Sequence, residues 1–233
     1  MIELPSCTFI LAQKIKNVKF KINEVIKMRV KGFSSPDMGE NCYIVTGENK
    51  EAVVIDPGNT AVKVINYIKA EGLAVKAILQ THAHFDHMCA AQEIQAATGA
   101  DIYITKAEAE VAANPDYNLS SIFGYAEAYH YDKELLSGDV IEFGDTSCRV
   151  ILTPGHTGGG CCFYFEAEGA LFSGDTLFMG SVGRTDFPTG DEETLRKSII
   201  EKLYTLPDET KVFCGHGPST TIGFEKQHNE YVF

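Results

Sequence analysis

The stretch Thr81-His82-Ala83-His84-Phe85-Asp86-His87 places three imidazoles and one carboxylate within six consecutive positions. It follows an apolar run, residues 75–79, that predicts a buried strand. His82 and His84 would share one face of an extended chain, while Asp86 and His87 would turn towards a second point. Neutral imidazoles and carboxylates are ligands that suit zinc, iron and manganese. The stretch therefore predicts a metal site on a loop at the end of a strand.

Composition and charge restrict the class of protein. The chain has 233 residues, 44% hydrophobic and 22% charged, which is typical of a globular protein with a sizeable core. Its net charge of -12 argues against nucleic acid as a partner, because a phosphate backbone selects a basic surface. Seven cysteines without regular spacing favour a reducing, cytoplasmic environment over a disulfide framework. No apolar run approaches the roughly 20 residues of a membrane-spanning helix, so no membrane partner is expected.

Two stretches of alternating elements make up the chain. Residues 1–24 are interpreted as an N-terminal extension of unclear role, and residues 25–233 as one domain. In the first stretch, strands are expected at residues 25–33, 41–46, 52–55, 75–79 and 101–105, and helices at residues 60–71, 88–98 and 106–113. This order predicts an α/β layered domain.

A long irregular segment, residues 116–138, separates the two stretches, and loops of this length are often functional. Beyond it, strands are expected at residues 140–143, 148–152, 161–165, 170–172 and 211–214, and helices at residues 191–203 and 224–231. Strands followed by helices therefore occur twice, which predicts two sheets packed face to face with helices outside.

Three further candidate ligands each lie just past a strand in a glycine-containing turn. His156 follows Pro154-Gly155, Asp175 follows Ser173-Gly174, and His216 lies between Gly215 and Gly217. Glycine lets the backbone approach a ligand closely and adopt unusual dihedral angles. Three such turns, together with the cluster after residue 79, predict that all of them contribute to one site.

The number of candidate ligands predicts the number of metals. The seven side chains exceed what one tetrahedral zinc accepts. Two cations would use all of them, one held by His82, His84 and His156, the other by Asp86, His87 and His216, with Asp175 shared. Zinc is the expected metal, with iron or manganese as alternatives. A water between two cations loses a proton near neutral pH, which predicts hydrolysis with Asp86 and Asp175 as catalytic carboxylates.

These motifs resemble those of metallo-β-lactamase-fold hydrolases, and within them the short, single-domain glyoxalase II-like proteins. The resemblance runs from about Met28 to Tyr231, and rests on residues 81–87, 153–159, 173–178, 183–187 and 215–218. It implies a four-layer αββα sandwich with a dinuclear site at one edge of the paired sheets. It also implies thioester hydrolysis, since glyoxalase II converts S-D-lactoylglutathione to D-lactate and glutathione. A small-molecule thioester is therefore the expected partner.

The sequence departs from its relatives at informative positions. Dizinc lactamases typically carry Cys where this chain has Asp175, which argues against β-lactam hydrolysis, and flavodiiron relatives carry Glu where it has His84. Full-length glyoxalase II adds a helical C-terminal domain that holds glutathione. The chain continues about 17 residues beyond His216, so that domain is expected to be absent, and residues 116–138 are the candidate replacement for its substrate wall.

Two other activities remain open. Persulfide dioxygenases resemble this chain in fold and in residues 183–187, but use a single iron, which here would be held by His82, His156 and Asp175. The complete second ligand set favours a hydrolase. A lactonase or phosphodiesterase would use the same site, and a non-enzymatic relative is disfavoured by the intact ligands.

A few residues outside the ligand set have candidate roles. Arg184, Tyr125 and Tyr129 are candidate substrate contacts, although an Arg184–Asp186 pair that braces its own loop is the favoured interpretation. The cysteines at 161, 162 and 214 are expected in the core. Thr81 and Thr157 are expected to orient ligand imidazoles through hydrogen bonds.

Overall fold

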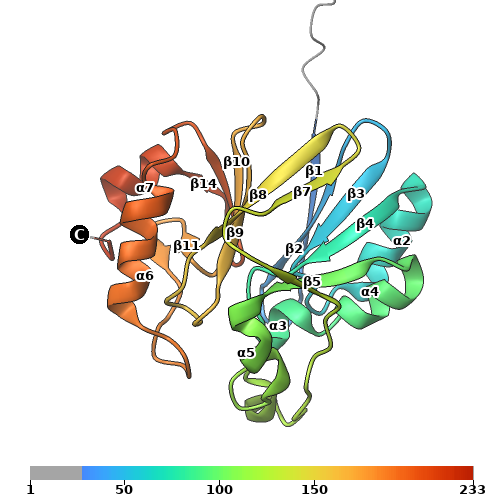
Figure 1. The fold of residues 1–233 in the computed structure, drawn as a ribbon, viewed down its shortest axis with the longest axis horizontal. Helices are drawn as coiled ribbons and strands as arrows, with labels where there is room; N and C mark the ends of the chain where they lie inside the picture. The colour runs from blue at the N-terminus through green and yellow to red at the C-terminus, as the bar shows by residue number, and fades with distance from the viewer. Residues whose placement is uncertain (1–27, 233) are drawn as a thin grey trace, which may run out of the picture.

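The computed structural model describes residues 28–232, so the expected extension, residues 1–24, and the start of the strand expected at 25–33 lie outside the described residues. Two six-stranded sheets face each other, with helices on both outer sides (Figure 1). The predicted four-layer αββα sandwich is confirmed. Among the described residues, no helix has the length and apolar character needed to cross a membrane.

The first sheet has the strand order β1-β2-β3-β4-β5-β6. Its strands are β1 (Arg29–Ser34), β2 (Asn41–Thr46), β3 (Glu51–Ile55), β4 (Ala74–Leu79), β5 (Asp101–Thr105) and β6 (Lys133–Leu135). Antiparallel pairing of β1 to β3 gives way to parallel pairing from β3 to β6. The parallel connections contain α2 (Ala61–Glu71), α3 (Phe85–Met88), α4 (Ala91–Thr98), η1 (Lys106–Glu108), α5 (Ala109–Ala113) and η2 (Ser120–Phe123).

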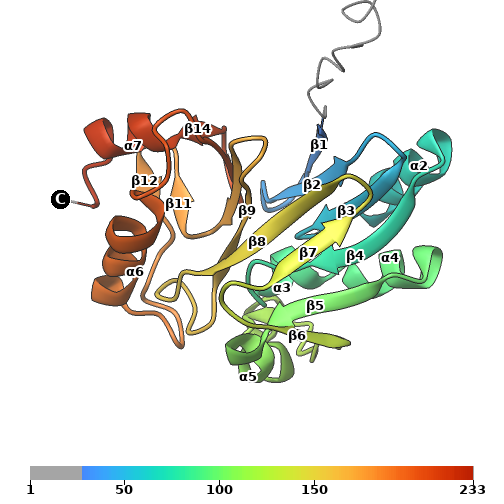
Figure 2. The same ribbon diagram turned by 45° about the horizontal axis from the view of Figure 1, so that its top comes forward.

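The second sheet has the strand order β14-β13-β10-β9-β8-β7. Its strands are β7 (Val140–Phe143), β8 (Thr146–Leu152), β9 (Cys161–Phe165), β10 (Ala170–Gly174), β13 (Lys211–Cys214) and β14 (Thr220–Thr221). Its outer side carries α6 (Glu192–Ser198), the π-helical segment η3 (Ile199–Leu203) and α7 (Ile222–His228), as the turned view shows (Figure 2). A small hairpin, β11 (Leu177–Phe178) and β12 (Ser181–Val182), follows β10.

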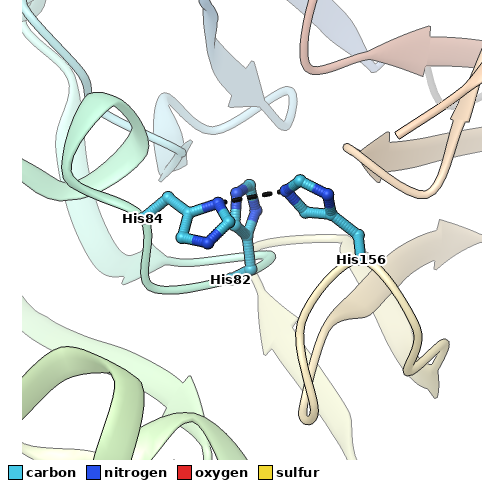
Figure 3. A group of neighbouring side chains, drawn as sticks. All are labelled: His82, His84 and His156. Atoms are coloured by element: carbon cyan, nitrogen blue, oxygen red, sulfur yellow. Dashed lines mark hydrogen bonds between the residues drawn. The ribbon is translucent and has the colours of Figure 1, made fainter. Parts of the chain in front are cut away.

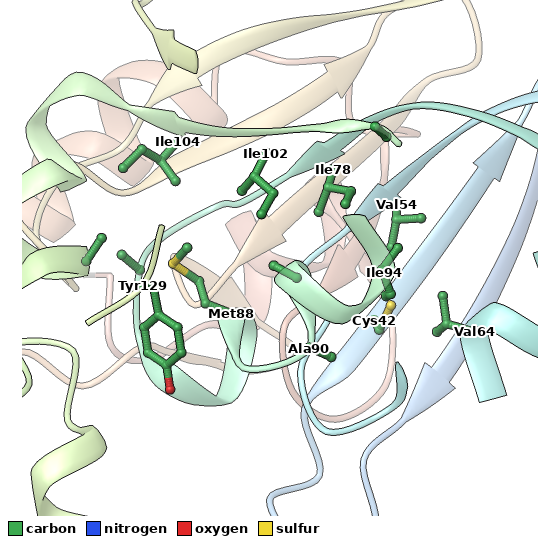
Figure 4. Close-up of a cluster of buried hydrophobic side chains, with 14 of the residues drawn as sticks. Cys42, Val54, Val64, Ile78, Met88, Ala90, Ile94, Ile102, Ile104 and Tyr129 are labelled. Atoms are coloured by element: carbon green, nitrogen blue, oxygen red, sulfur yellow. The ribbon is translucent and has the colours of Figure 1, made fainter. Parts of the chain in front are cut away.

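Alternation along the strands explains the layers. On β9, Phe163 and Phe165 face the first sheet, while Cys162 and Tyr164 pack against the helical side. A strand that is buried on both faces, such as β9, therefore has a continuous run of apolar residues in the sequence. The helical side of the first sheet packs against Val64 of α2 and Ile94 of α4, as Figure 4 shows. The cysteines at 161, 162 and 214 are buried, which confirms their predicted place in the core.

Three helix and strand predictions need correction. The helix expected at 88–98 is two helices, α3 and α4, because Ala90 has a non-helical backbone (φ -102, ψ 0) and donates its N–H to the carbonyl of Pro57. The terminal helix begins earlier than expected, because the Thr221 hydroxyl accepts the N–H of Phe224, and it ends at His228. Strand β6 was not predicted within 116–138, because one buried residue, Leu135, gives no detectable alternation.

Candidate metal centre

The structure brings the seven predicted ligand side chains together at one edge of the paired sheets. Their donor atoms form groups in which all atoms lie within 4.8 Å of one another. The three-histidine group contains His82, His84 and His156, and the mixed group contains Asp86, His87 and His216. Asp175 shares a further group with His82 and His87. The ligand roles stay predictions, but the donor atoms of each group lie close enough together to bind a metal ion.

The three-histidine group joins the loop after β4 to the turn between β8 and β9. His84 Nδ1 lies 3.0 Å from His156 Nε2, and the His82 ring lies beside both (Figure 3). All three side chains are buried. His84 faces this group through Nδ1, and Nε2 of His82 has no hydrogen-bond partner among the described residues. Because buried polar nitrogens are normally paired, the free Nε2 of His82 is consistent with a cation site.

The mixed group lies beside the first and is less enclosed. His87 Nε2 lies 3.3 Å from His216 Nε2, and Asp86 Oδ2 lies 3.4 Å from His216 Nε2. The His87 side chain is fully buried, whereas that of His216 is 29% exposed. The side of the site that solvent reaches is therefore the one with Asp86 and His216.

Asp175 lies between the two groups. Its Oδ1 is 3.3 Å from His87 Nε2, and its Oδ2 is 3.6 Å from both His156 Nε2 and His216 Nε2. A Cβ on Gly215 would collide with the Asp175 carboxylate, so glycine is required for this close approach. The Asp175 carboxylate thus contacts members of both groups, with one oxygen near His87 and the other near His156 and His216.

A tight turn on the second sheet fixes His156. Gly155 has φ +134, and a Cβ there would collide with the backbone of Leu195 in α6. The Gly155 carbonyl accepts the N–H of Asp191, whose side chain caps α6. His156 Nδ1 lies 2.7 Å from the carbonyl oxygen of Arg184, which leaves Nε2 to face the site.

Two buried carboxylates behind the site were missed by the sequence analysis. Asp56 contacts Thr81 and His87, and Glu108 accepts N–H groups from Ala83 and Gly159. No local sequence motif identifies Asp56 or Glu108, because the residues that each contacts are far away in the sequence. The predicted role of Thr81 is supported, since its hydroxyl lies 3.1 Å from His82 Nδ1. The Thr157 side chain lies instead beside Glu108.

Burial keeps the three-histidine group neutral. It lowers the pKa of His82 well below the ordinary value and, together with neighbouring His156, lowers the pKa of His84 to about 3. It also lowers the pKa of His156, although Asp175 opposes the shift. Neutral imidazole is the form that binds metal, so this group is ready for a cation at neutral pH.

Carboxylates reverse this effect in the mixed group. Burial acts to lower the pKa of His87, but Asp175 and Asp86 outweigh it and raise that pKa well above its ordinary value. The pKa of His216 is raised against burial by Asp86 and Asp175. Burial acts to raise the pKa of Asp175, and His87 outweighs it, so that pKa falls well below the ordinary value. Negative charge thus predominates beside the mixed group, and a cation would balance it.

The donor set fits divalent metal ions. The buried His82 Nε2 has no hydrogen-bond partner among the described residues, and His82 belongs both to the three-histidine group and to the group with His87 and Asp175. Imidazole with carboxylate is the chemistry that zinc, iron and manganese accept.

Two adjoining cavities open from the site. One, of about 440 Å³, is lined by Asp175, His216, Arg184 and Phe187 among others. The second, of about 390 Å³, contains both predicted tyrosines, Tyr125 and Tyr129. Both cavities are lined by Met38, Phe85, Asp86 and Phe123, so they adjoin along these four residues.

The three predicted substrate contacts differ in surroundings. Arg184 donates to both oxygens of Asp186, at 2.7 and 2.6 Å, and its guanidinium stacks 3.9 Å from the Phe187 ring centroid. The predicted pair within this loop is therefore present. Tyr125 is 63% exposed, whereas Tyr129 is 7% exposed and also packs in the core.

Comparison with known proteins identifies the family. A sequence profile of the metallo-beta-lactamase superfamily matches residues 36–216, and the chain belongs to this superfamily. It is 34% identical to hydroxyacylglutathione hydrolase GloC of Haemophilus influenzae over 201 residues, which cover 83% of this chain and 92% of that protein. The fold binds divalent metals, and the chain is a metal-dependent hydrolase of this superfamily.

Two solved structures are similar over almost their whole length. The BLEG-1 B3 metallo-beta-lactamase is 37% identical with a TM-score of 0.83, and the match covers 88% of this chain and 99% of that one. TTHA1623, solved in a di-iron-bound form, is 33% identical with a TM-score of 0.77, and the match covers 86% and 99%.

Proposed function

We propose that this protein belongs to the glyoxalase II-like group and is a dinuclear thioesterase that acts on hydroxyacylglutathione-type thioesters. The observation that carries the proposal is the position of Asp175, whose two oxygens contact members of both ligand groups. A carboxylate shared by two cations needs this placement. Similarity to GloC, a hydroxyacylglutathione hydrolase, supports the substrate class.

Each group would hold one divalent cation. His82, His84 and His156 would hold the first, Asp86, His87 and His216 the second, and Asp175 would be shared. Zinc suits these donors best, and iron or manganese are the alternatives. Such cations, when bound, supply a Lewis acid for a carbonyl and lower the pKa of water towards neutrality.

Asp86 is positioned to accept a proton. Its side chain is 13% exposed and lines both cavities. Burial acts to raise its pKa, but His87 and His216 outweigh burial and hold that pKa below the ordinary value, so Asp86 is ionised at neutral pH. Since Oδ2 faces His87 and His216, Oδ1 is left to accept a proton from the attacking water.

The two cavities provide space for the two sides of a thioester. Asp86 is one of the residues that line both, so a carbonyl placed beside it would direct one arm into each cavity. The first cavity offers Phe187 and Arg184, with the charge of Arg184 paired to Asp186. The second offers the rings of Phe123, Tyr125 and Tyr129. Mostly apolar walls with a few polar groups are typical of small-molecule sites.

The arrangement favours this function over a persulfide dioxygenase. That reaction would use His82, His156 and Asp175, and leave four clustered side chains without a role. Lactone or phosphodiester hydrolysis would use the same residues, and the comparison with a B3 metallo-beta-lactamase adds β-lactams to the substrates worth testing.

A substrate panel tests the proposal. Protein with measured metal content is assayed for thiol release from S-D-lactoylglutathione, and in parallel with a lactone, a phosphodiester, a β-lactam and glutathione persulfide with oxygen consumption. We expect thiol release to have the largest kcat/KM. Tyr125→Ala should raise KM, because Tyr125 lines the second cavity. Tyr231→Ala should not, because Tyr231 is an exposed tyrosine just after α7 that lines neither cavity. A larger kcat/KM for any other substrate overturns the thioesterase assignment.

A further inference from the structure

Glu108 is a buried carboxylate that the proposed chemistry does not use. It lies at the end of η1 and is 0% exposed. Its Oε2 accepts the N–H of Ala83 at 2.8 Å, and its Oε1 accepts the N–H of Gly159 at 2.7 Å. Both oxygens are therefore occupied by backbone donors, which is the way a buried carboxylate is normally stabilised.

The two donors belong to the two loops that build the three-histidine group. Ala83 stands between His82 and His84, on the loop after β4 of the first sheet. Gly159 lies three residues after His156, in the turn between β8 and β9 of the second sheet. One side chain thus spans the interface between the two sheets where the histidines meet.

The same short segment holds Gly159 from its other side. The Thr105 hydroxyl donates to the Gly159 carbonyl at 2.6 Å. A Cβ on Gly159 would lie 2.7 Å from the backbone nitrogen of Glu108, so the turn packs directly against η1. Both polar groups of the Gly159 residue are therefore bound by residues 105–108, which restricts movement of the turn.

We propose that Glu108 is a positioning residue that sets the separation of the His82–His84 loop from the His156 turn and so determines metal affinity at the three-histidine group. It contacts neither the predicted ligands' donor atoms nor the cavities that substrate would occupy. The mixed group has no hydrogen bond to Glu108 and should be affected less. This inference rests on metal binding by the cluster, whichever substrate the enzyme takes.

The geometry requires a glutamate. In Glu108→Gln the amide NH2 would face one of the two backbone N–H groups, so one hydrogen bond and the charge are lost with the shape retained. Loss of a residue that orients metal ligands lowers metal affinity by about 10- to 100-fold. We expect a loss of this size at the three-histidine group and a smaller loss at the mixed group, because the two backbone N–H groups bound by Glu108 lie on the loops that carry His82, His84 and His156.

The experiment measures zinc release from the full-length protein against a competing chelator, with the two steps assigned by Co²⁺ substitution and its absorption spectrum. Three imidazoles and a mixed carboxylate set give different Co²⁺ bands, so each step can be attributed to one group. For Glu108→Gln we expect weaker zinc binding in the step assigned to the three-histidine group. This measurement does not depend on catalytic activity. Thiol release, measured separately, reports on the proposed function.

A matched control separates positioning from general stability. Glu225 is also 0% exposed and accepts N–H groups from Gly180 and Asn229, but contacts neither ligand loop. Glu225→Gln should lower Tm and leave zinc affinity unchanged at both groups. Thr105→Val should lower zinc affinity at the three-histidine group by about 2- to 10-fold, as expected for the loss of one neutral hydrogen bond. This variant tests the proposal if Glu108→Gln does not fold. Unchanged zinc steps in the Glu108 and Thr105 variants, or equal loss at both groups, overturn the proposal.

Discussion

Asp56 lies directly behind His87, with its Oδ2 3.2 Å from His87 Nδ1. The same carboxylate accepts the N–H and the hydroxyl of Thr81, each at 2.7 Å. Because the Thr81 hydroxyl also contacts His82, one buried aspartate orients imidazoles of both ligand groups. A carboxylate behind an imidazole fixes its ring and directs Nε2 towards the metal.

Asp56→Asn is therefore expected to weaken metal binding by about 10- to 100-fold, mainly at the mixed group. Asparagine keeps the side-chain shape and tolerates the left-handed backbone of this position, φ +48, so the fold should persist. Chelator competition measures the affinity. Asp132→Asn, which removes a carboxylate that accepts the Ile102 N–H away from the site, is the control. Equal zinc affinity in Asp56→Asn and the wild type would show that the contact is not needed.

Acid should release the two metals in sequence. The pKa values of His87 and His216 are raised, whereas those of His82 and His84 are lowered. A proton must leave an imidazole before a metal binds, so protons compete better at the mixed group. As pH falls from 7, the mixed group is expected to lose its metal first. Metal content measured after equilibration at stepwise lower pH checks this order, and earlier loss from the three-histidine group contradicts it.

Glu40 should make the stability of the metal-free protein depend on pH. Burial raises the pKa of this carboxyl from 4.5 to about 9. The folded state then keeps a proton that the unfolded state loses, so the stabilisation is present below pH 4.5 and decreases as pH rises towards 9. Glu40→Gln, which is neutral at every pH, should be more stable than wild type at pH 8 by at least about 1 kcal/mol.

Urea unfolding of the metal-free proteins at pH 5 and pH 8 measures this difference. The two proteins should differ more at pH 8 than at pH 5. An equal difference at both pH values would mean that Glu40 is not held protonated by the fold.

Phe172 tests the packing of the two sheets. It is buried in β10 and contacts Tyr43 of β2, with ring centroids 5.2 Å apart. Phe172→Ala is expected to lower the free energy of unfolding by about 3 to 5 kcal/mol, because a large core side chain leaves a cavity. Phe224→Ala, at a position 37% exposed on α7, should cost less than about 1 kcal/mol. Similar losses in the two variants would contradict the assignment of Phe172 to the interface between the sheets.

Local signals explain why most of the fold and the ligand cluster could be predicted. Three of the five candidate histidines and Asp86 lie within residues 82–87, which the structure divides between a loop and α3, and the remaining candidates stand beside glycines near strand ends. Continuous apolar runs identified strands buried on both faces, such as β9. The predicted small-molecule partner, the cytoplasmic location and the single domain at residues 25–233 stay predictions.

Long-range contacts explain what could not be predicted. Asp56 binds Thr81 across 25 positions, and Glu108 binds Gly159 across 51 positions, so no local spacing reveals either pair. Tyr129 was expected at the substrate mouth. It lines the second cavity but is otherwise buried, because the segment around it folds back and its N–H donates to Ala112.

The central claim is that the His/Asp cluster hydrolyses thioesters with two metal ions. The most direct measurement is thiol release from S-D-lactoylglutathione as metal-free protein receives increasing equivalents of zinc, with Asp175→Ala as the control. We predict that activity rises until about two equivalents per chain are bound, as for a two-metal site, and that it is absent from the Asp175→Ala variant. No thiol release from protein that has bound two equivalents, or equal release by the variant, would contradict the account.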